Sequence, residues 1–475
     1  MYSGKIIKRL KLYGFLFILL HLAEAKVYTL DELIEVAIRN SKDLRIIELE
    51  IQKAETEVQD IVGSAMPLIT ASVNLSHSIP FDPYKSFDDI SFRQSLFNVL
   101  SDSISGVIPA DLTGFASSIM TKSSLLNGRI MQFQDNAATG TITLNQPIYA
   151  QGKTGLGIKI ARAYQRTLLC KYQTERLKLK ASMTRMFYQA LLAQKNVEIA
   201  REAVLLSEQT HRLTLITYAL GKVSELDTLN SLFALEKSKI DLKKVQSDLL
   251  MVYETIIIQA ALIENAQSMS VEGEFPQDEF KAEIDLVLEK VRKNNPDLEQ
   301  LRGGSEIRDL RIQLAKCEFY PSVYAGASLG GMGLFDHISN VSNTNWGTDH
   351  KFFIGVNWNI FTGLRRNQKV AQAEIERELF QISEQKIFEN MELQTRKAFD
   401  QVTNSFEQLH TFKSLQKIAE KGLEIAKKAY EVGSKTLLDV QNAEHQLNSA
   451  KVAFNAAQYN YHIAIINLKL LMSDL

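Results

Sequence analysis

The sequence predicts a mainly α protein with a membrane β-barrel portion, in which long coiled-coil helices accompany four β-strands per chain. Three observations lead to this prediction. Proline is scarce, with 8 residues in 475, and it is absent from 148–275 and 322–475. Four short segments alternate apolar with small polar residues and carry no charge. The chain also contains two copies of one unit.

Residues 1–25 have the three parts of a secretory signal peptide. The apolar run Leu12–Leu22 is followed by Ala23-Glu24-Ala25, which places small residues at a cleavage site. A membrane anchor is the alternative, but this run is too short to span a bilayer. We therefore expect cleavage after Ala25. The basic residues around its start are Lys5, Lys8, Arg9 and Lys11.

Charge and cysteine content exclude some classes of function. The formal net charge is −1, whereas broad nucleic-acid binding needs a basic surplus, so we expect no nucleic-acid partner. The two cysteines, Cys170 and Cys317, either form a disulfide in an oxidising compartment or pack as small apolar residues. They do not have the spacing of a metal site.

The duplication divides the mature chain into a first structural repeat, 26–275, and a second, 276–475. Matched positions late in the two repeats are separated by fewer residues than matched positions early in them. This difference indicates an insertion in the Ser-rich segment 80–138 of the first repeat, where the second repeat has the shorter segment 331–351. Matched positions are 30–40 with 284–294, and Tyr218, Gly221 and Asp227 with Tyr430, Gly433 and Asp439.

Each repeat opens with helices and then contributes two strands. The four predicted strands are about 68–79, 140–149, 322–330 and 352–361. None of these segments contains Asp, Glu, Lys or Arg, although 23% of the chain is charged. A half-exposed soluble sheet usually carries charges on its wet face. Strands of this length with one apolar and one uncharged polar face are instead typical of transmembrane barrels. A soluble β-sandwich is the alternative.

Membrane strands would have consequences for assembly. Four strands are too few to close a barrel, and lipid tolerates no open sheet edge, so several chains would share one barrel. The insertion 80–138 is unusually apolar for a surface loop, and we expect it to cover the barrel mouth or to contact neighbouring protomers. Aromatic residues near the strand ends that suit a membrane interface are Tyr149, Tyr320, Phe335 and Phe361.

The Pro-free stretches predict two long helices, 153–217 and 364–429, each followed by a return helix, 224–265 and 436–474. Each long helix would measure about 100 Å. Apolar residues recur in steps of four and three, which is a coiled-coil pattern. A soluble coiled-coil rod would explain these helices but not the uncharged strands. One such run is Ala443, Leu447, Ala450, Phe454, Ala457, Tyr461, Ala464, Leu468 and Leu471.

Several motifs together resemble the TolC family of outer-membrane efflux channels over nearly the whole mature chain. They are LDEL with Ala37 and Asn40 in 30–40, AMP at 65–67, FYP at 319–321, LNQPIYAQG at 144–152 and YEVGSKTLLDV at 430–440. The resemblance implies a homotrimer whose three sets of four strands close a twelve-stranded barrel. A periplasmic α-helical barrel would continue it.

The resemblance also implies a location and partners. The protein would lie in the cell outer membrane, in contact with its lipid, with a large periplasmic part. It would be the passive exit duct of a tripartite efflux or type I secretion system, docked to a periplasmic adaptor (membrane fusion) protein and an inner-membrane pump. Small molecules and proteins are both open as cargo. The alternative is a periplasmic coiled-coil scaffold or adaptor without a channel.

The turns between long and return helices carry local signals of their own. Gly221 and Gly433 suit the left-handed residue that ends a helix. The segments Ser224–Asp227 and Thr436–Asp439 have the spacing of a capping box at the start of the next helix. Helix capping is therefore one sufficient explanation for both aspartates.

The resemblance implies that these turns form the periplasmic mouth. Asp227, Tyr430 and Lys435 would hold the entrance closed, and Asp439 would line it as a ring that favours cations. Two departures weaken the match. Asn442 stands where the family has a second ring aspartate, and Lys435 stands where it has arginine, which predicts weaker selectivity and a looser closure. The expected adaptor-docking tips are Gly221, Lys222, Gly433 and Ser434.

We expect no enzyme activity, no cofactor and no metal. Gly152-Lys153-Thr154 has the end of a phosphate-binding loop, but Pro147 stands where the loop needs its first glycine. The energy for export would then come from partner proteins.

Overall fold

The computed structural model describes residues 26–77, 136–276, 279–335 and 346–475, which form two compact units. Among these described residues, the helical unit comprises those up to Gln59 with those of Gly157–Ala315 and Asn367–Leu475, and the strand unit comprises those of Asp60–Leu156 and Lys316–Arg366. Each unit therefore combines segments from both predicted repeats. The signal peptide and most of the predicted insertion lie outside the described residues.

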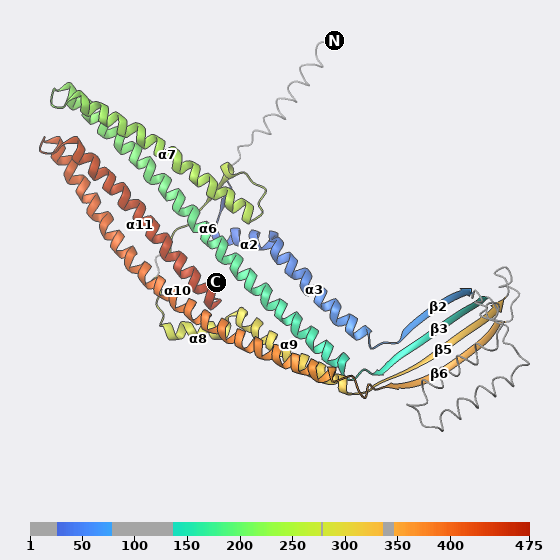
Figure 1. Cartoon of the computed structure of the whole chain (residues 1–475). Coiled ribbons are helices and arrows are strands. Elements are labelled where there is room, and N and C mark those ends of the chain that lie inside the picture. Colours follow the sequence, from blue (N-terminus) through green and yellow to red (C-terminus); the bar gives the residue numbers. More distant parts are fainter. Residues whose placement is uncertain (1–25, 78–135, 277–278, 336–345) are drawn as a thin grey trace, which may run out of the picture. The chain divides into compact units, whose positions relative to one another are not determined.

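Four long helices dominate the helical unit and run as two antiparallel hairpins, α6 with α7 and α10 with α11 (Figure 1). Helices α6 and α10 have 67 residues each and contain no proline. Among the described helices, none is both long enough and apolar enough to cross a membrane. The bounds are α6 Lys153–Ala219, α7 Glu225–Gln259, α10 Arg365–Glu431 and α11 Leu437–Met472.

Two pairs of shorter helices accompany the hairpins. They are α2 (Leu30–Asn40) with α3 (Lys42–Gly63), and α8 (Ile284–Asn294) with α9 (Pro296–Lys316). Helix α2 begins at a capping box between Thr29 and Glu32. In α9, Gly303 lies against a side chain of α6 and Gly304 against one of α10, where a Cβ would leave too little room. These glycines therefore let α9 approach both long helices closely.

The apolar run predicted on α11 faces the core of the helical unit. Tyr461 and Leu468 are buried, and they pack with Val287 of α8 and Val402 of α10. A second cluster forms around Phe187 of α6 and Ile256 of α7. The coiled-coil spacing thus brings apolar side chains of separate helices together.

The helical unit also contains a parallel strand pair that the periodicity does not predict, β1 (Lys26–Tyr28) with β4 (Met269–Val271). The return helix predicted over 224–265 is wrong at its end, because α7 stops at Gln259 and the chain continues through the 3-10 helix η1 (Ala266–Ser268) to β4. Tyr28 donates a hydrogen bond to Glu264 Oε1 at 2.6 Å. A contact between distant segments therefore accompanies the early end of this helix.

The strand unit holds one antiparallel sheet with the strand order β2-β3-β5-β6 (Figure 1). Strands β2 and β6 form its edges, and the central pair, β3 with β5, joins the two predicted repeats. The bounds are β2 Leu68–His77, β3 Asn136–Tyr149, β5 Ser322–Phe335 and β6 Trp346–Asn357, with the 3-10 helix η2 (Cys317–Phe319) before β5.

Strand β6 corrects the strand predicted over 352–361. It starts earlier, at Trp346, and residues 358–361 are not in a strand. It therefore contains Asp349 and Lys351, which form an ion pair, so the observed strands are not free of charge. Backbone pairing with the long strand β5 extends the ladder beyond the segment that apolar alternation indicates.

The register gives the sheet one apolar and one largely polar face. Phe352 on the apolar face is 87% exposed, and Ile69 on the same face is exposed too, so the described residues leave much of this face uncovered. Lys351 belongs to the polar face, which explains how the strand tolerates its charge. One apolar row is Ile69, Leu144, Ala327 and Phe352, and the neighbouring polar row is Thr70, Thr143, Ser328 and Lys351.

Both cysteines are free thiols. Cys317 is buried and Cys170 is half-buried. The disulfide that the sequence leaves open is therefore not formed.

Candidate functional site

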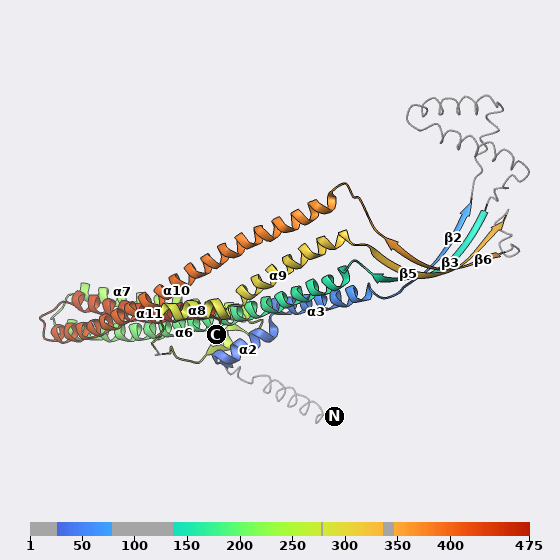
Figure 2. The same cartoon turned by 90° about the horizontal axis from the view of Figure 1, so that it is seen from below.

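Both hairpins turn with the same backbone geometry. Gly221 and Gly433 have φ values of +68° and +79°, the left-handed conformation expected of them. The next N–H, of Lys222 or Ser434, donates to the carbonyl five residues earlier at 3.0 and 2.9 Å. Both turns lie at the same end of the helical unit (Figures 1 and 2). The helix-ending role predicted for the two glycines is confirmed.

Both aspartates of the predicted gate cap the return helices. Asp227 Oδ2 accepts from the backbone N–H of Ser224 at 2.9 Å and from its hydroxyl at 2.8 Å. Asp439 Oδ2 makes the same two contacts with Thr436, both at 2.9 Å. The backbone hydrogen bond from Thr436 holds the pKa of Asp439 below its usual range. Both capping boxes are confirmed, and the Asp439 carboxylate stays charged near neutral pH.

The structure brings one pair of the predicted gate residues together. Lys435 Nζ lies 3.6 Å from Asp439 Oδ1. Tyr430 is only 8% exposed and packs against Leu437 and other apolar side chains of α6 and α11. Its hydroxyl has no hydrogen-bond partner among the described residues. Among the described residues no hydrogen bond or ion pair joins Asp227 to Tyr430 or Lys435, so closure by these residues stays a prediction.

The predicted docking residues are exposed, and apolar side chains that sequence reasoning missed lie beside them. The exposed tip residues are Gly221, Lys222, Gly433 and Ser434. The neighbouring exposed apolar residues are Leu220, Leu226, Val432 and Leu438. These four occupy matched positions in the two turns, one before each glycine and one in each first turn of the return helix. The internal repeat is the signal that could have found them, because paired uncovered apolar residues indicate an interaction surface.

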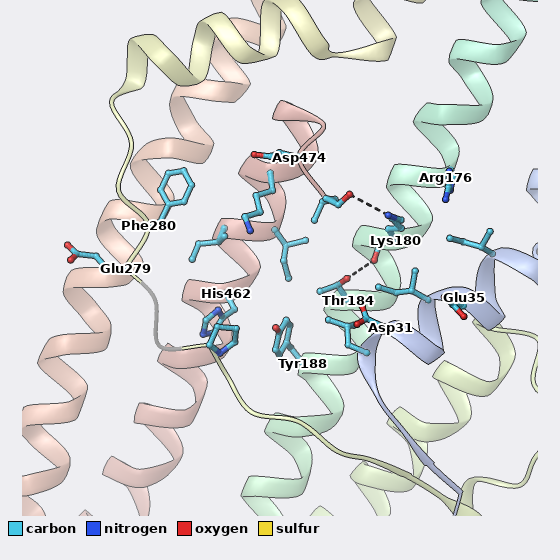
Figure 3. A pocket seen from close by; sticks show the side chains of 18 of the residues that line it. Asp31, Glu35, Arg176, Lys180, Thr184, Tyr188, Glu279, Phe280, His462 and Asp474 are labelled. Atoms are coloured by element: carbon cyan, nitrogen blue, oxygen red, sulfur yellow. Dashed lines mark hydrogen bonds between the residues drawn. The ribbon is translucent and has the colours of Figure 1, made fainter.

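A cavity of about 780 Å³ lies in the helical unit between α2, α6 and α11 (Figure 3). Tyr188 and His462 line it, with their rings stacked at a centroid distance of 5.5 Å. Burial lowers the pKa of His462 to about 4, so its imidazole is neutral at pH 7. Basic side chains, Arg176, Lys180 and Lys469, and acidic ones, Asp31 and Glu35, also line the cavity.

Neither a metal-binding cluster nor a nucleophile at a strand-to-helix turn is present at the positions considered within the described residues. No group of three or more His, Cys, Asp or Glu side chains is placed to hold a metal ion within the described ranges. Gly326, Ser328 and Gly330 have the spacing of a hydrolase nucleophile motif. They lie within β5, which is paired on both sides, and not at the strand-to-helix turn that such a nucleophile needs.

Comparison with known proteins finds a matching family, sequence relatives and solved structures with a similar fold. A family model described as "Outer membrane efflux protein" matches residues 114–257 and 287–473. Outer membrane protein TolC of Salmonella enteritidis is 24% identical over 219 residues, which cover 44% of this chain and 43% of that protein. The crystal structure of a membrane protein from Pseudomonas aeruginosa has a TM-score of 0.71 at 15% identity, covering 93% of this chain and 90% of that one. The Campylobacter jejuni CmeC outer membrane channel has a TM-score of 0.69 at 15% identity, covering 94% and 85%.

These findings differ in what they show. The solved structures share the fold, and their low identity carries no more than that. The match to TolC spans less than half of that protein's length. The family model covers most of this chain in two segments, which include all four long helices almost entirely. The chain therefore belongs to the outer membrane efflux protein family, and it is an outer-membrane protein with a periplasmic part.

Proposed function

We propose that three copies of this chain form the exit channel of a tripartite efflux or type I secretion system. The observation that carries the proposal is the sheet of the strand unit, which has one uncovered apolar face and one largely polar face. Strands that face lipid on one side and a water-filled lumen on the other need this alternation. The long helical hairpins would continue the lumen into the periplasm.

The two sheet edges support a shared barrel. Strands β2 and β6 each pair on one side only within the described chain. An unpaired edge is costly in lipid, because its backbone groups have no other partner there. Pairing β6 of one copy with β2 of the next closes three sheets into twelve strands, an adequate number for a channel.

Exposed apolar stripes on the long helices support the same assembly. They recur at coiled-coil spacings of three, four and seven residues, yet the described residues leave them uncovered. A neighbouring copy would bury them. The exposed residues are Leu415, Ile418 and Ile425 on α10, and Leu229, Phe233 and Ile240 on α7.

The gate and the docking tips complete the proposal. Asp227 lies on α7, whereas Tyr430, Lys435 and Asp439 belong to the α10–α11 hairpin, so contacts among them would tie different hairpins together. The exposed turns with their apolar neighbours would receive a periplasmic adaptor, and an inner-membrane pump would supply the energy. The two halves of the chain, 26–275 and 276–475, would be repeats of one ancestral unit.

The experiment that tests the function is reconstitution of the purified, full-length protein. We expect it in the outer-membrane fraction, as a trimer in detergent, and conducting ions across a planar lipid bilayer. A water-soluble monomer without conductance would overturn the channel and favour a periplasmic coiled-coil scaffold.

Opening the gate should be visible in single channels. We expect Lys435→Ala and Asp227→Ala to raise single-channel conductance, because each removes a charge that would hold neighbouring hairpins together at the entrance. Lys428→Ala is the matched control, since it removes an exposed lysine whose ion pair with Glu424 stays within α10. Unchanged conductance in both gate variants would contradict the assignment of the gate.

A further inference from the structure

A carboxyl group is buried between the two helical hairpins. Glu444 lies on α11, is 8% exposed, and accepts a hydrogen bond from Thr210 Oγ1 of α6 at 2.6 Å. Thr210 is buried too, and so is its α6 neighbour Thr214. This hydrogen bond joins α6 of one hairpin to α11 of the other.

The surroundings of Glu444 are poor in compensating charge. From α10, Lys427 is the one cation that lowers its pKa, and the two form no ion pair among the described residues. His211 of α6 is hydrogen-bonded to Ser231 instead. Glu444 lines a groove whose other charged or titratable side chains are Lys237 and Asp241 of α7 and His445 of α11.

Burial therefore has the largest effect on the pKa of Glu444. Removal from water raises the pKa of Glu444, and the hydrogen bond from Thr210 opposes the rise without cancelling it. An ionised carboxylate at this site lacks a close cation, whereas a neutral carboxyl needs none.

A second contact between the same two helices differs in its exposure. Lys451 Nζ of α11 lies 2.6 Å from Glu202 Oε2 of α6, and the glutamate side chain is 60% exposed. Because water screens such a pair, it contributes little to helix association. The two contacts therefore make a natural comparison of a buried with an exposed carboxylate in one interface.

We propose that Glu444 is a proton-operated latch: neutral, it keeps α11 packed on α6, and ionised, it loosens the two hairpins. The proposal rests on the proposed channel function, in which the gate residues lie on these hairpins. Asp439 is five residues before Glu444 near the start of the same helix, so loosening at Glu444 would reach the entrance.

The direction of the pH effect follows from the thermodynamic linkage between protonation of Glu444 and packing of the helices. The packed state has the higher pKa for Glu444, so it binds the proton more tightly than a loosened state does. Its contribution to packing is fully present below the ordinary glutamate pKa and is lost as pH rises through the raised value. Acid in the periplasm would therefore favour the closed channel.

The test records the reconstituted trimer in planar bilayers between about pH 5 and about pH 8. The open probability of the wild type should fall on acidification, by up to about tenfold for each unit by which the pKa values of the two states differ. Glu444→Gln, which mimics the neutral carboxyl, should keep a low open probability at every pH. Glu202→Gln, the matched control, should retain the wild-type pH dependence.

A second measurement separates failure of the latch from failure of the channel. Glu444→Gln should raise the unfolding temperature of the purified protein at about pH 8 and leave it unchanged at about pH 5. Thr210→Val should shift the wild-type transition to higher pH, because it removes the hydrogen bond that favours the carboxylate. Absence of conductance in the wild type counts against the channel alone. Equal pH dependence of the wild type and Glu444→Gln, in conductance or in unfolding, overturns the latch.

Discussion

Replacing Ile142 by arginine should destabilise the membrane-inserted protein by about 2–4 kcal/mol per chain, the cost of a cation near the bilayer midplane of a barrel strand. Ile142 lies in the middle of β3, on the apolar face of the sheet, and is exposed in the single chain. In the proposed barrel its side chain meets lipid, which cannot solvate a guanidinium group. Three copies per trimer multiply the effect.

The neighbouring position provides a matched control for this prediction. Thr143 is the next residue of β3 and belongs to the polar face, opposite Thr70 and Ser328. Thr143→Arg should therefore be tolerated, because its side chain would enter the aqueous lumen. The measurement is the yield of detergent-stable trimer from outer membranes, with urea unfolding in lipid vesicles for the free energy. Equal losses in the two variants would exclude the proposed assignment of faces.

Acidification should destabilise the helical unit through His462. Its ring is buried and packs against both Tyr188 and Phe275, with centroids 5.5 and 5.4 Å away, and those two rings also stack on each other. Burial lowers the pKa from the ordinary 6.5 to about 4, so a proton binds the unfolded chain more tightly by about 3 kcal/mol. Stability from this group is present above the ordinary pKa and is lost as pH falls toward about 4.

The aromatic variant His462→Phe should remove this loss, because phenylalanine keeps the ring and takes up no proton. Chemical unfolding of the wild type and the variant at a series of pH values measures the difference in their free energies of unfolding. Contributions of other titrating groups cancel in this difference, including that of Glu444, which has the opposite pH trend. His410→Phe, at an exposed histidine of α10, should leave the pH dependence of the wild type in place. If His462→Phe kept the acid sensitivity of the wild type, the assignment of that sensitivity to His462 would be refuted.

The turns show which features the local sequence is sufficient to predict. Gly221 and Gly433 end their helices in the left-handed conformation, and the capping boxes of Asp227 and Asp439 form as their spacing indicates. These features depend on a few neighbouring residues, so a short motif suffices to predict them. The gate is different. Tyr430 is buried without a hydrogen-bond partner for its hydroxyl among the described residues, a property that the motif around it does not reveal.

The ends of β6 and α7 show what the local sequence does not predict. Alternation located β6 but misplaced it, because pairing with β5 extends the strand through Asp349 and Lys351, which face the polar side. The apolar pattern of α7 continues past Gln259, where the helix stops. In both cases partners from elsewhere in the chain accompany the departure from the local pattern, backbone groups of β5 for β6 and the side chains of Asn40 and Tyr28 beyond α7.

By itself, then, the sequence determined the long helices, the turns and their caps, and the alternating faces of the strands, since each depends on residues within a few turns or one strand. Only the tertiary structure decided the end of α7, the extent of β6 and the burial of Tyr430, His462 and Glu444. The contacts involved join distant segments, with Tyr28 and Glu264 separated by 236 residues and Thr210 and Glu444 by 234. No periodicity within a helix or strand records which remote residue will pack against it, because that choice is made by the fold as a whole.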